Sequence, residues 1–196
     1  MNKVEMNKSM KLSEHFTLGE MCKTKYKTAD GNIPSHVVIE NLKRVCGWLE
    51  ELRVLAGVRP QSKVAGDCTL RPDPRPADST LAPEAGAAGS AARAEAGAAA
   101  EARGEAIVIN SGYRSPEVNR LAGGVSSSNH VTGCAVDIRC AGKEQMIRYA
   151  AILLDIADGT KQDFDELLLE QHGSVCWLHF AVRPKDNRRR IALIKA

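Results

Sequence analysis

The sequence lacks three features, each of which would place it in a different class of protein. No apolar run follows the polar, lysine-bearing first ten residues, so nothing there could serve as a signal-peptide core or a membrane span. The six cysteines include no Cys-x-x-Cys pair, so we expect reduced, mostly buried thiols rather than a disulfide framework. The formal net charge of only +3 does not favour nucleic acid as a partner. We therefore expect a protein that is cytoplasmic as synthesised and spans no membrane.

The composition changes abruptly within one long segment of the chain. Residues 60–104 begin with a proline-rich stretch and continue, from 85 to 102, as almost only Ala, Gly, Glu and Arg. No residue of that second stretch is apolar and large enough to anchor a core, which predicts a flexible low-complexity insertion. A groove-binding polyproline stretch at its start is the alternative to an inert linker. The prediction is one domain over residues 11–196, interrupted by 60–104, with an N-terminal tail at 1–10.

The sequence on either side of this segment predicts several helices and strands. Thr17 to Glu20 has the pattern of a capping box, and Ser35 can cap a longer helix that ends near Leu55. Ser115, followed by proline, opens a short helix after a β-branched strand at 107–111. The other predicted elements are a helix at 143–158 and strands at 134–140, 166–170, 177–182 and 191–194. Together they predict an α+β fold, with helices packed on a mostly antiparallel sheet.

Three polar residues of the second half have the chemistry of a zinc site. Strand alternation turns Asp137 and His179 away from their apolar neighbours, and the turn at Gly133 brings His130 back toward Asp137. Two imidazoles and one carboxylate suit Zn²⁺ and leave a fourth position for a water, whose pKa the metal lowers toward about 7. Each residue alone is more simply explained as structural. The three together favour a metal site with an open position.

The order of these residues is similar to that of a known family. The chain has Ser-x-His-x-x-Gly-x-Ala-x-Asp at 128–137, Trp-Leu-His at 177–179 and Ser-Gly-Tyr-Arg-Ser at 111–115. This pattern resembles the zinc D-alanyl-D-alanine carboxypeptidases and dipeptidases, which form subfamily A of the M15 peptidases. Their clan also includes phage L-alanyl-D-glutamate endolysins and the hedgehog signalling domain. The resemblance excludes the insertion and is greatest for the mobile-element or phage type.

The resemblance implies a fold and a set of site residues. The fold would be hedgehog/D-Ala-D-Ala peptidase-like. The implied zinc ligands are His130, Asp137 and His179. Arg114 would hold a substrate carboxylate or polarise the scissile carbonyl, for which its guanidinium fork is suited, and Ser128 would support the first-ligand loop or the substrate. Tyr113 is assigned to substrate binding with them. A salt bridge that anchors the loop is the structural alternative for Arg114.

The general base is the point at which the sequence departs from the family pattern. Many relatives carry an acid a few residues before the final zinc histidine, where this chain has Cys176, and a neutral thiol replaces a carboxylate poorly. The nearest acid is Glu170, which a hairpin can return beside His179, so Glu170 is predicted to be the catalytic proton shuttle. The alternatives are Glu166, Asp165 and the weaker candidate His172.

The expected activity is that of a zinc metallopeptidase that hydrolyses peptidoglycan stem peptides, in a carboxypeptidase-like or endolysin-like manner. We expect a monomer with Zn²⁺ as cofactor, which reaches the cell wall after lysis or by non-classical release. The alternative is a catalytically silent, zinc-clamped module that binds a cell-wall peptide or a protein. The absence of an acid at position 176 keeps this alternative open. An enzyme and a binding module of this kind would have the same fold, so the fold does not distinguish the two functions.

Overall fold

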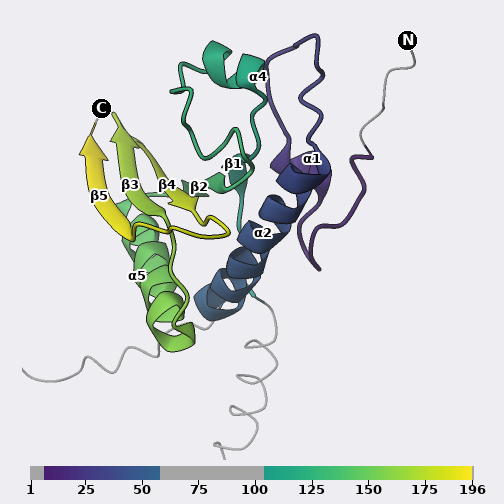
Figure 1. Cartoon of the computed structure of the whole chain (residues 1–196). Coiled ribbons are helices and arrows are strands. Elements are labelled where there is room, and N and C mark those ends of the chain that lie inside the picture. The colour runs from purple at the N-terminus through teal and green to yellow at the C-terminus, as the bar shows by residue number, and fades with distance from the viewer. Residues whose placement is uncertain (1–6, 58–103, 196) are drawn as a thin grey trace, which may run out of the picture.

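A computed structural model describes residues 7–57 and 104–195, so the predicted insertion lies outside the described residues except for Gly104. The helices are α1 (Leu18–Met21), α2 (His36–Gly57), α4 (Pro116–Leu121) and α5 (Lys143–Thr160). The strands are β1 (Ile109–Ser111), β2 (Ala135–Cys140), β3 (Glu166–His172), β4 (Val175–Ala181) and β5 (Arg190–Lys195), as Figure 1 shows. Each element lies at or close to its predicted position, and the α+β prediction is confirmed.

The five strands form one mixed sheet in the order β1-β2-β4-β3-β5. The first three neighbouring pairs are antiparallel and only β3 and β5 run parallel, so the sheet is mostly antiparallel as predicted. The hairpin between β3 and β4 is the tightest connection, whereas β2 and β4 are joined through α5 and β3. The hedgehog/D-Ala-D-Ala peptidase-like fold stays a prediction.

Local capping chemistry explains where two of the helices begin. The Thr17 hydroxyl accepts from the Glu20 backbone N–H at 3.3 Å, and Glu20 Oε2 accepts from the Thr17 backbone N–H at 2.9 Å, which completes the predicted capping box of α1. At α4, the Ser115 hydroxyl accepts from the Val118 N–H at 3.3 Å, and Pro116 occupies the first helical turn. Both helices therefore begin where side chains satisfy backbone donors.

The two long helices, α2 and α5, cover one face of the sheet (Figure 1). Alternate residues of the central strands point into this layer, among them Val136 and Ile138 of β2 and Leu178 and Phe180 of β4, and all four are buried. The hydrophobic cluster includes residues from before position 58 and after position 103. Residues of the intervening register, including Asp137 and His179, therefore lie on the opposite face.

The chain leaves α2 and returns to the fold at the same place. The Glu105 N–H donates to the Arg53 carbonyl at 2.8 Å. Arg148 of α5 donates to the Ala56 carbonyl at 2.8 Å and forms an ion pair with Glu105 at 2.5 Å. The two ends of the undescribed segment are thus held together by one hydrogen-bonded cluster.

Part of the predicted N-terminal tail lies against the domain. The Met10 carbonyl accepts from the Leu18 N–H at 2.8 Å, and the Lys8 carbonyl accepts from the Gly19 N–H at 3.0 Å. The described part of the chain contains no helix that is both long and apolar enough to cross a membrane.

Candidate metal centre

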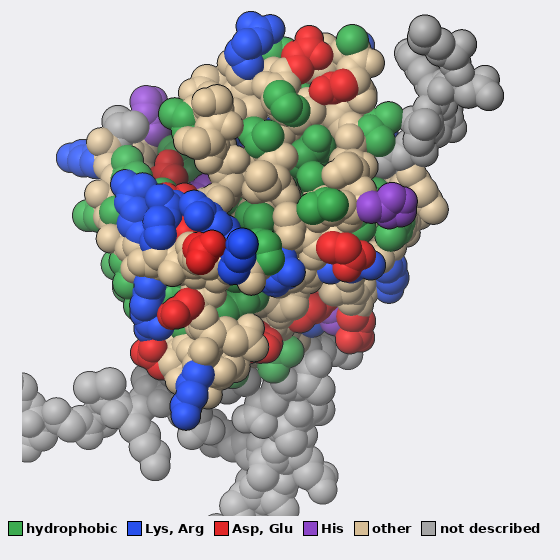
Figure 2. All heavy atoms as spheres, in the orientation of Figure 1, with side chains coloured by type: hydrophobic (Ala, Val, Ile, Leu, Met, Phe, Trp, Pro, Cys, Tyr) green, Lys and Arg blue, Asp and Glu red, His purple; other side chains and the backbone are tan. Residues whose placement is uncertain are grey.

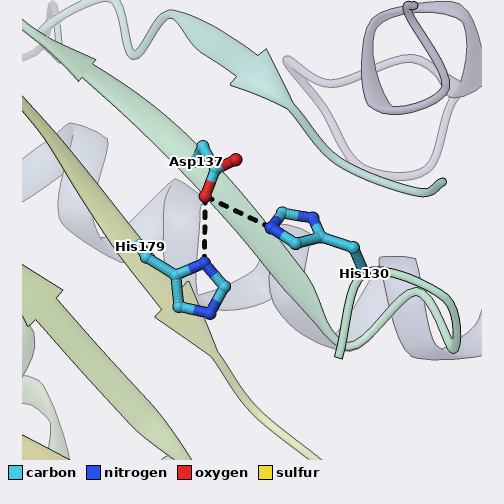
Figure 3. A group of neighbouring side chains, drawn as sticks. All are labelled: His130, Asp137 and His179. Carbon is cyan, nitrogen blue, oxygen red and sulfur yellow. Dashed lines mark hydrogen bonds and ion pairs between the residues drawn. The ribbon is translucent and has the colours of Figure 1, made fainter. Parts of the chain in front are cut away.

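His130, Asp137 and His179 converge on the sheet face that the helices leave open (Figure 3). One ligand atom from each residue lies within 4.8 Å of the others. Asp137 Oδ1 lies 3.2 Å from His130 Nε2 and 2.9 Å from His179 Nδ1. All three residues are buried, at 3% exposed for His130 and 8% for each of the other two. The sequence pattern therefore selects residues that do lie together.

A tight turn positions His130. Gly133 has φ of +70°, a conformation that favours glycine, and its N–H donates to the His130 carbonyl at 3.2 Å. The ring Nδ1 donates to the Gly112 carbonyl at 2.6 Å, since a carbonyl oxygen can only accept. This bond places the proton of a neutral His130 on Nδ1 and leaves the lone pair of Nε2 directed at Asp137.

Strand pairing positions His179 opposite Asp137. The two residues are register partners across β2 and β4, so their side chains leave the sheet on the same face. Nδ1 of His179 contacts Asp137, and Nε2 lies 3.6 Å from Glu166 Oε2 on β3. A carboxylate behind the second ring nitrogen is the usual arrangement for a metal-binding histidine, because it fixes the ring orientation.

Charge within the cluster is strongly coupled. Burial by itself would raise the pKa of Asp137, but the charge of His130 and hydrogen bonds from both histidines hold that pKa far below its usual range. Burial lowers the pKa of His179, yet hydrogen bonds to Asp137 and Glu166 outweigh it and raise the pKa to about 9. The hydrogen bond from His179 lowers the pKa of Glu166 to about 2. The carboxyl groups of Asp137 and Glu166 are therefore negatively charged at neutral pH.

The contacts of His130 fit a bound cation. A carboxylate oxygen only accepts, and a neutral His130 whose proton is on Nδ1 presents a lone pair to Asp137 at 3.2 Å. Two electron-rich atoms approach so closely only with a cation between them, which is either a second ring proton or a metal ion. Two imidazoles and a carboxylate are ligands that suit Zn²⁺.

Arg114 and Ser128 border this cluster, whereas Tyr113 lies in the core. Arg114 Nη2 donates to Asp137 Oδ2 at 2.5 Å, and its Nε donates to Ser111 Oγ at 2.8 Å. The Ser128 hydroxyl accepts from the His130 N–H at 3.3 Å, so it supports the ligand loop. Tyr113 is only 6% exposed and packs within the hydrophobic cluster. Arg114 thus holds the carboxylate oxygen that faces away from the histidines.

The acids proposed as general bases have different surroundings. Glu170 is half-buried on the same strand face as Glu166, and its register partner is Trp177, two residues from His179. Burial raises the pKa of Glu170, although the charges of His179 and Arg114 oppose this. Glu166 Oε2 lies 3.6 Å from His179 Nε2, and Glu166 Oε1 accepts from Arg190 Nη1 at 2.9 Å.

Three other polar residues near β3 and β4 lie elsewhere. Asp165 is fully buried and is held by Arg188 at 2.7 Å and Arg183 at 3.1 Å. His172 is exposed at the hairpin turn. Cys176 is buried on the helix-covered face of the sheet, opposite Cys140, so its side chain points away from the cluster. Of these acids, Glu170 is the one on the site face that forms no ion pair with any described residue, although a hydrogen bond with Trp177 acts to lower its pKa.

Two asparagines that were not predicted from the sequence support the loops around the candidate metal centre. Asn129 donates to Asp165 Oδ2 at 2.7 Å and to Glu166 Oε2 at 3.0 Å, so it links the His130 loop to β3. Asn32 is 2% exposed with φ of +53°, and it donates to the Cys22 and Tyr113 carbonyls. Asn129 lies inside the motif, so its position beside the first ligand was an available signal. Nothing local in the sequence marks Asn32.

A comparison with family models finds one that is described as Peptidase M15 and matches residues 83–165. This span is less than half of the chain; it includes Arg114, His130 and Asp137, and it ends before His179. The match confirms the resemblance to M15 peptidases, whereas the subfamily and the mobile-element or phage type stay predictions. No curated protein matches the sequence.

Proposed function

We propose, from the match of residues 83–165 to the Peptidase M15 family model, that the protein is a zinc metallopeptidase that hydrolyses peptidoglycan stem peptides. The observation that carries the proposal is the approach of His130 Nε2 and His179 Nδ1 to a single oxygen of Asp137. The family match and this donor set support a hydrolase that uses a metal. The D-Ala-D-Ala carboxypeptidase-like or endolysin-like manner of cleavage is the finer part of the proposal.

The proposed ligands are His130 through Nε2, His179 through Nδ1 and Asp137 through Oδ1. Zn²⁺ bound there supplies Lewis acidity toward a carbonyl oxygen and makes water a better nucleophile at neutral pH. The ring nitrogens that do not face Asp137 are directed at the Gly112 carbonyl and at Glu166. These second contacts hold both rings in the orientation that binding requires.

Glu170 is proposed as the proton shuttle of the reaction. It lies on the site face of β3 and receives the electrostatic influence of His179, Asp137 and Arg114. A raised carboxyl pKa moves toward neutrality, where general acid–base catalysis is most efficient. Glu170 accepts a proton from the attacking water and returns it to the leaving amine. Glu166 is instead proposed to orient His179, since Asn129 and Arg190 also bind it.

Arg114 and Ser128 are proposed to act on the substrate side of the cluster, with Tyr113 behind them. The Arg114 guanidinium has one nitrogen on Asp137 and one on Ser111, which leaves Nη1 to meet a substrate carbonyl or carboxylate. Tyr113 contributes through the backbone of the same loop, because its N–H donates to the Met21 carbonyl at 2.7 Å.

A catalytically silent zinc-clamped binding module is the second candidate function. The observation that favours it is Cys176, which takes the place of an acid in the sequence and points into the core. In that case the same ligands hold zinc as a clamp, and the open face of the sheet binds a cell-wall peptide without cleaving it.

Metal analysis combined with a cleavage assay tests the proposal. We expect close to one zinc per chain in the wild type and in Glu170→Gln, and loss of zinc in His179→Ala. With a synthetic stem pentapeptide, Glu170→Gln should lower kcat by about 10²- to 10⁴-fold, the usual contribution of a positioned acid–base group. Mass spectrometry of the products identifies the bond that is cut.

The matched control is Glu117→Gln, which changes a partly exposed acid in the first turn of α4 and should alter neither zinc content nor kcat. Zinc binding without cleavage of any stem peptide by the wild type would favour the binding module. Unchanged kcat in Glu170→Gln would refute the assignment of the base alone.

A further inference from the structure

A pocket of about 380 Å³ lies beside Arg114, between segments far apart in the sequence. One wall comes from residues 23–26, directly after α1, and the other from β1 and α4. Figure 1 shows the loop that follows α1 next to α4. The lining residues are Lys23, Thr24, Lys25, Tyr26, Asn110, Ser111, Arg114, Val118 and Ala122.

The two walls of the pocket are fixed to each other by the buried Asn32. Its Nδ2 donates to the Cys22 carbonyl at 2.9 Å and to the Tyr113 carbonyl at 3.3 Å. Its Oδ1 accepts from the Ser115 N–H at 2.7 Å. Asn32 thus connects the residues that precede Lys23 with those on either side of Arg114. Buried hydrogen bonds therefore hold the two walls of the pocket in place.

All charged residues that line the pocket are cations. They are Lys23, Lys25 and Arg114, and no Asp or Glu of residues 7–57 and 104–195 belongs to the lining. Lys23 and Lys25 are exposed and form no ion pair within the described parts of the chain. Lys25 Nζ lies 5.3 Å from the centre of the Tyr26 ring, which orients its charge over one wall. Arg114 is paired with Asp137, so the positive charge that the described residues leave unpaired comes from Lys23 and Lys25. Such a surface attracts anions.

Arg114 connects this pocket to the metal centre. Its Nη2 contacts Asp137, whereas the side chain as a whole lines the pocket. Ser111 has the same double position, because it lines the pocket and is the register partner of Asp137. A peptide bound at the metal centre and extending past Arg114 would therefore enter the pocket that Lys23 and Lys25 line.

We propose that this pocket binds a carboxylate of the peptide substrate, with Lys23 and Lys25 as specificity-determining residues. The inference rests on the proposed function and deepens it, because it selects peptides that carry a free carboxylate near the cleaved bond. Amidation of that carboxylate removes the charge that the two lysines recognise. The two exposed lysines, together with the Arg114 side chain beside them, favour an anionic peptide over a neutral one of the same length.

Calorimetric binding to the zinc-loaded Glu170→Gln protein tests this inference without turnover. The probes are a synthetic stem tetrapeptide with free carboxylates and the same peptide with every carboxylate amidated. We expect the acid form to bind more tightly, and the double substitution Lys23→Gln and Lys25→Gln to weaken its binding about tenfold while the amide is unaffected, as expected for two exposed ion pairs. The difference should shrink as salt is raised.

Lys27→Gln is the matched control, because Lys27 is exposed in the same loop and does not line the pocket. Equal binding of acid and amide forms, or a double variant that behaves like Lys27→Gln, would overturn the inference. Cleavage of the acid peptide by protein with Glu170 intact is measured separately. Failure of cleavage counts against the proposed function, whereas the binding preference still decides the role of the pocket.

Discussion

Asp165 shows how one buried carboxylate supports the candidate metal centre from outside it. The residue is fully buried and accepts from Asn129, next to the ligand His130, at 2.7 Å. Its other partners are Arg188 and Arg183, which lie on the segment that leads into β5. Burial raises the pKa of Asp165, but its hydrogen bonds with Arg188 and Asn129 outweigh this and lower the pKa below its usual value. Asp165, an alternative candidate for the general base in the sequence analysis, thus anchors the His130 loop to the segment before β5.

Asp165→Asn should lower the free energy of unfolding by about 2 kcal/mol at pH 7, the typical value for losing hydrogen bonds to a charged group. Because the folded-state pKa is depressed, the stabilisation is present above the unfolded pKa of about 3.9 and is lost as the pH falls through the folded value. Urea unfolding of both proteins at pH 7 and near pH 3 measures this difference.

Asp163→Asn is the control for Asp165→Asn, because Asp163 is 58% exposed and pairs with Arg189 on the surface. That substitution should change stability by less than about 0.5 kcal/mol. Figure 2 shows basic side chains gathered on the side of the molecule where β3 and β5 lie. Arg188 and Arg189, just before β5, and Arg190, its first residue, are exposed. An equal effect of both substitutions would mean that Asp165 acts only as one more surface charge.

At the scale of elements, the site depends on how β2, β4 and the turn before β2 fit together. Gly133 lies in that turn, and a Cβ there would come within 2.8 Å of both the carbonyl oxygen and the side chain of Val38 on α2. The turn that positions His130 therefore packs directly on the longest helix. Glycine is required at 133 both for its positive φ and for this close approach.

Gly133→Ala and Gly123→Ala separate these two requirements. Both glycines have positive φ, +70° and +77°, but a Cβ at Gly123 would meet nothing within 4 Å. Gly123→Ala should therefore cost only the backbone strain of about 1 kcal/mol, whereas Gly133→Ala should cost about 2 kcal/mol more through overpacking. Chemical denaturation measures both, and zinc affinity should fall only for Gly133→Ala. Equal losses would show that the contact with Val38 is not important.

Elements were predictable from sequence because their signals are local. The capping box at Thr17, the Ser115–Pro116 start and the alternation around Asp137 all act within a few residues, and each is confirmed in the structure. Strand ends shifted by one to a few residues where pairing extended beyond the apolar run, as at β3, which continues to His172. Pairing partners are supplied by other parts of the chain, so local pattern cannot set these ends.

At the scale of the whole molecule, residues 7–57 and 104–195 share one hydrophobic cluster and form one layered structure. Glu105 and Arg148 hold the end of α2, at Arg53 and Ala56, against the start of the second half. Met10 and Lys8 add the N-terminal residues to the same body. The helix-covered face of the sheet provides the core, and the open face provides the candidate metal centre.

Replacing residues 58–103 with a Gly/Ser linker of about eight residues should preserve the fold, because the ends to be joined are already hydrogen-bonded to each other. We expect the same zinc content and a closely similar melting temperature, measured by metal analysis and circular dichroism. The family match begins at residue 83, inside the replaced segment. Loss of folding or of zinc would therefore show that residues between 83 and 103 contribute to the domain.

The sequence by itself determined which residues could form the site. The spacing of the motif and the strand alternation indicated His130, Asp137 and His179 as metal ligands. Both of these patterns reflect geometry within a few neighbouring residues, so a sequence can reveal them. Only the tertiary structure decided how the surrounding groups are used: Glu166 lies behind His179, Asp165 anchors the ligand loop, and Asn32 links the two walls of the lysine-lined pocket. The physical reason is that register between distant strands and contacts between distant loops arise from packing of the whole core, which no local pattern encodes.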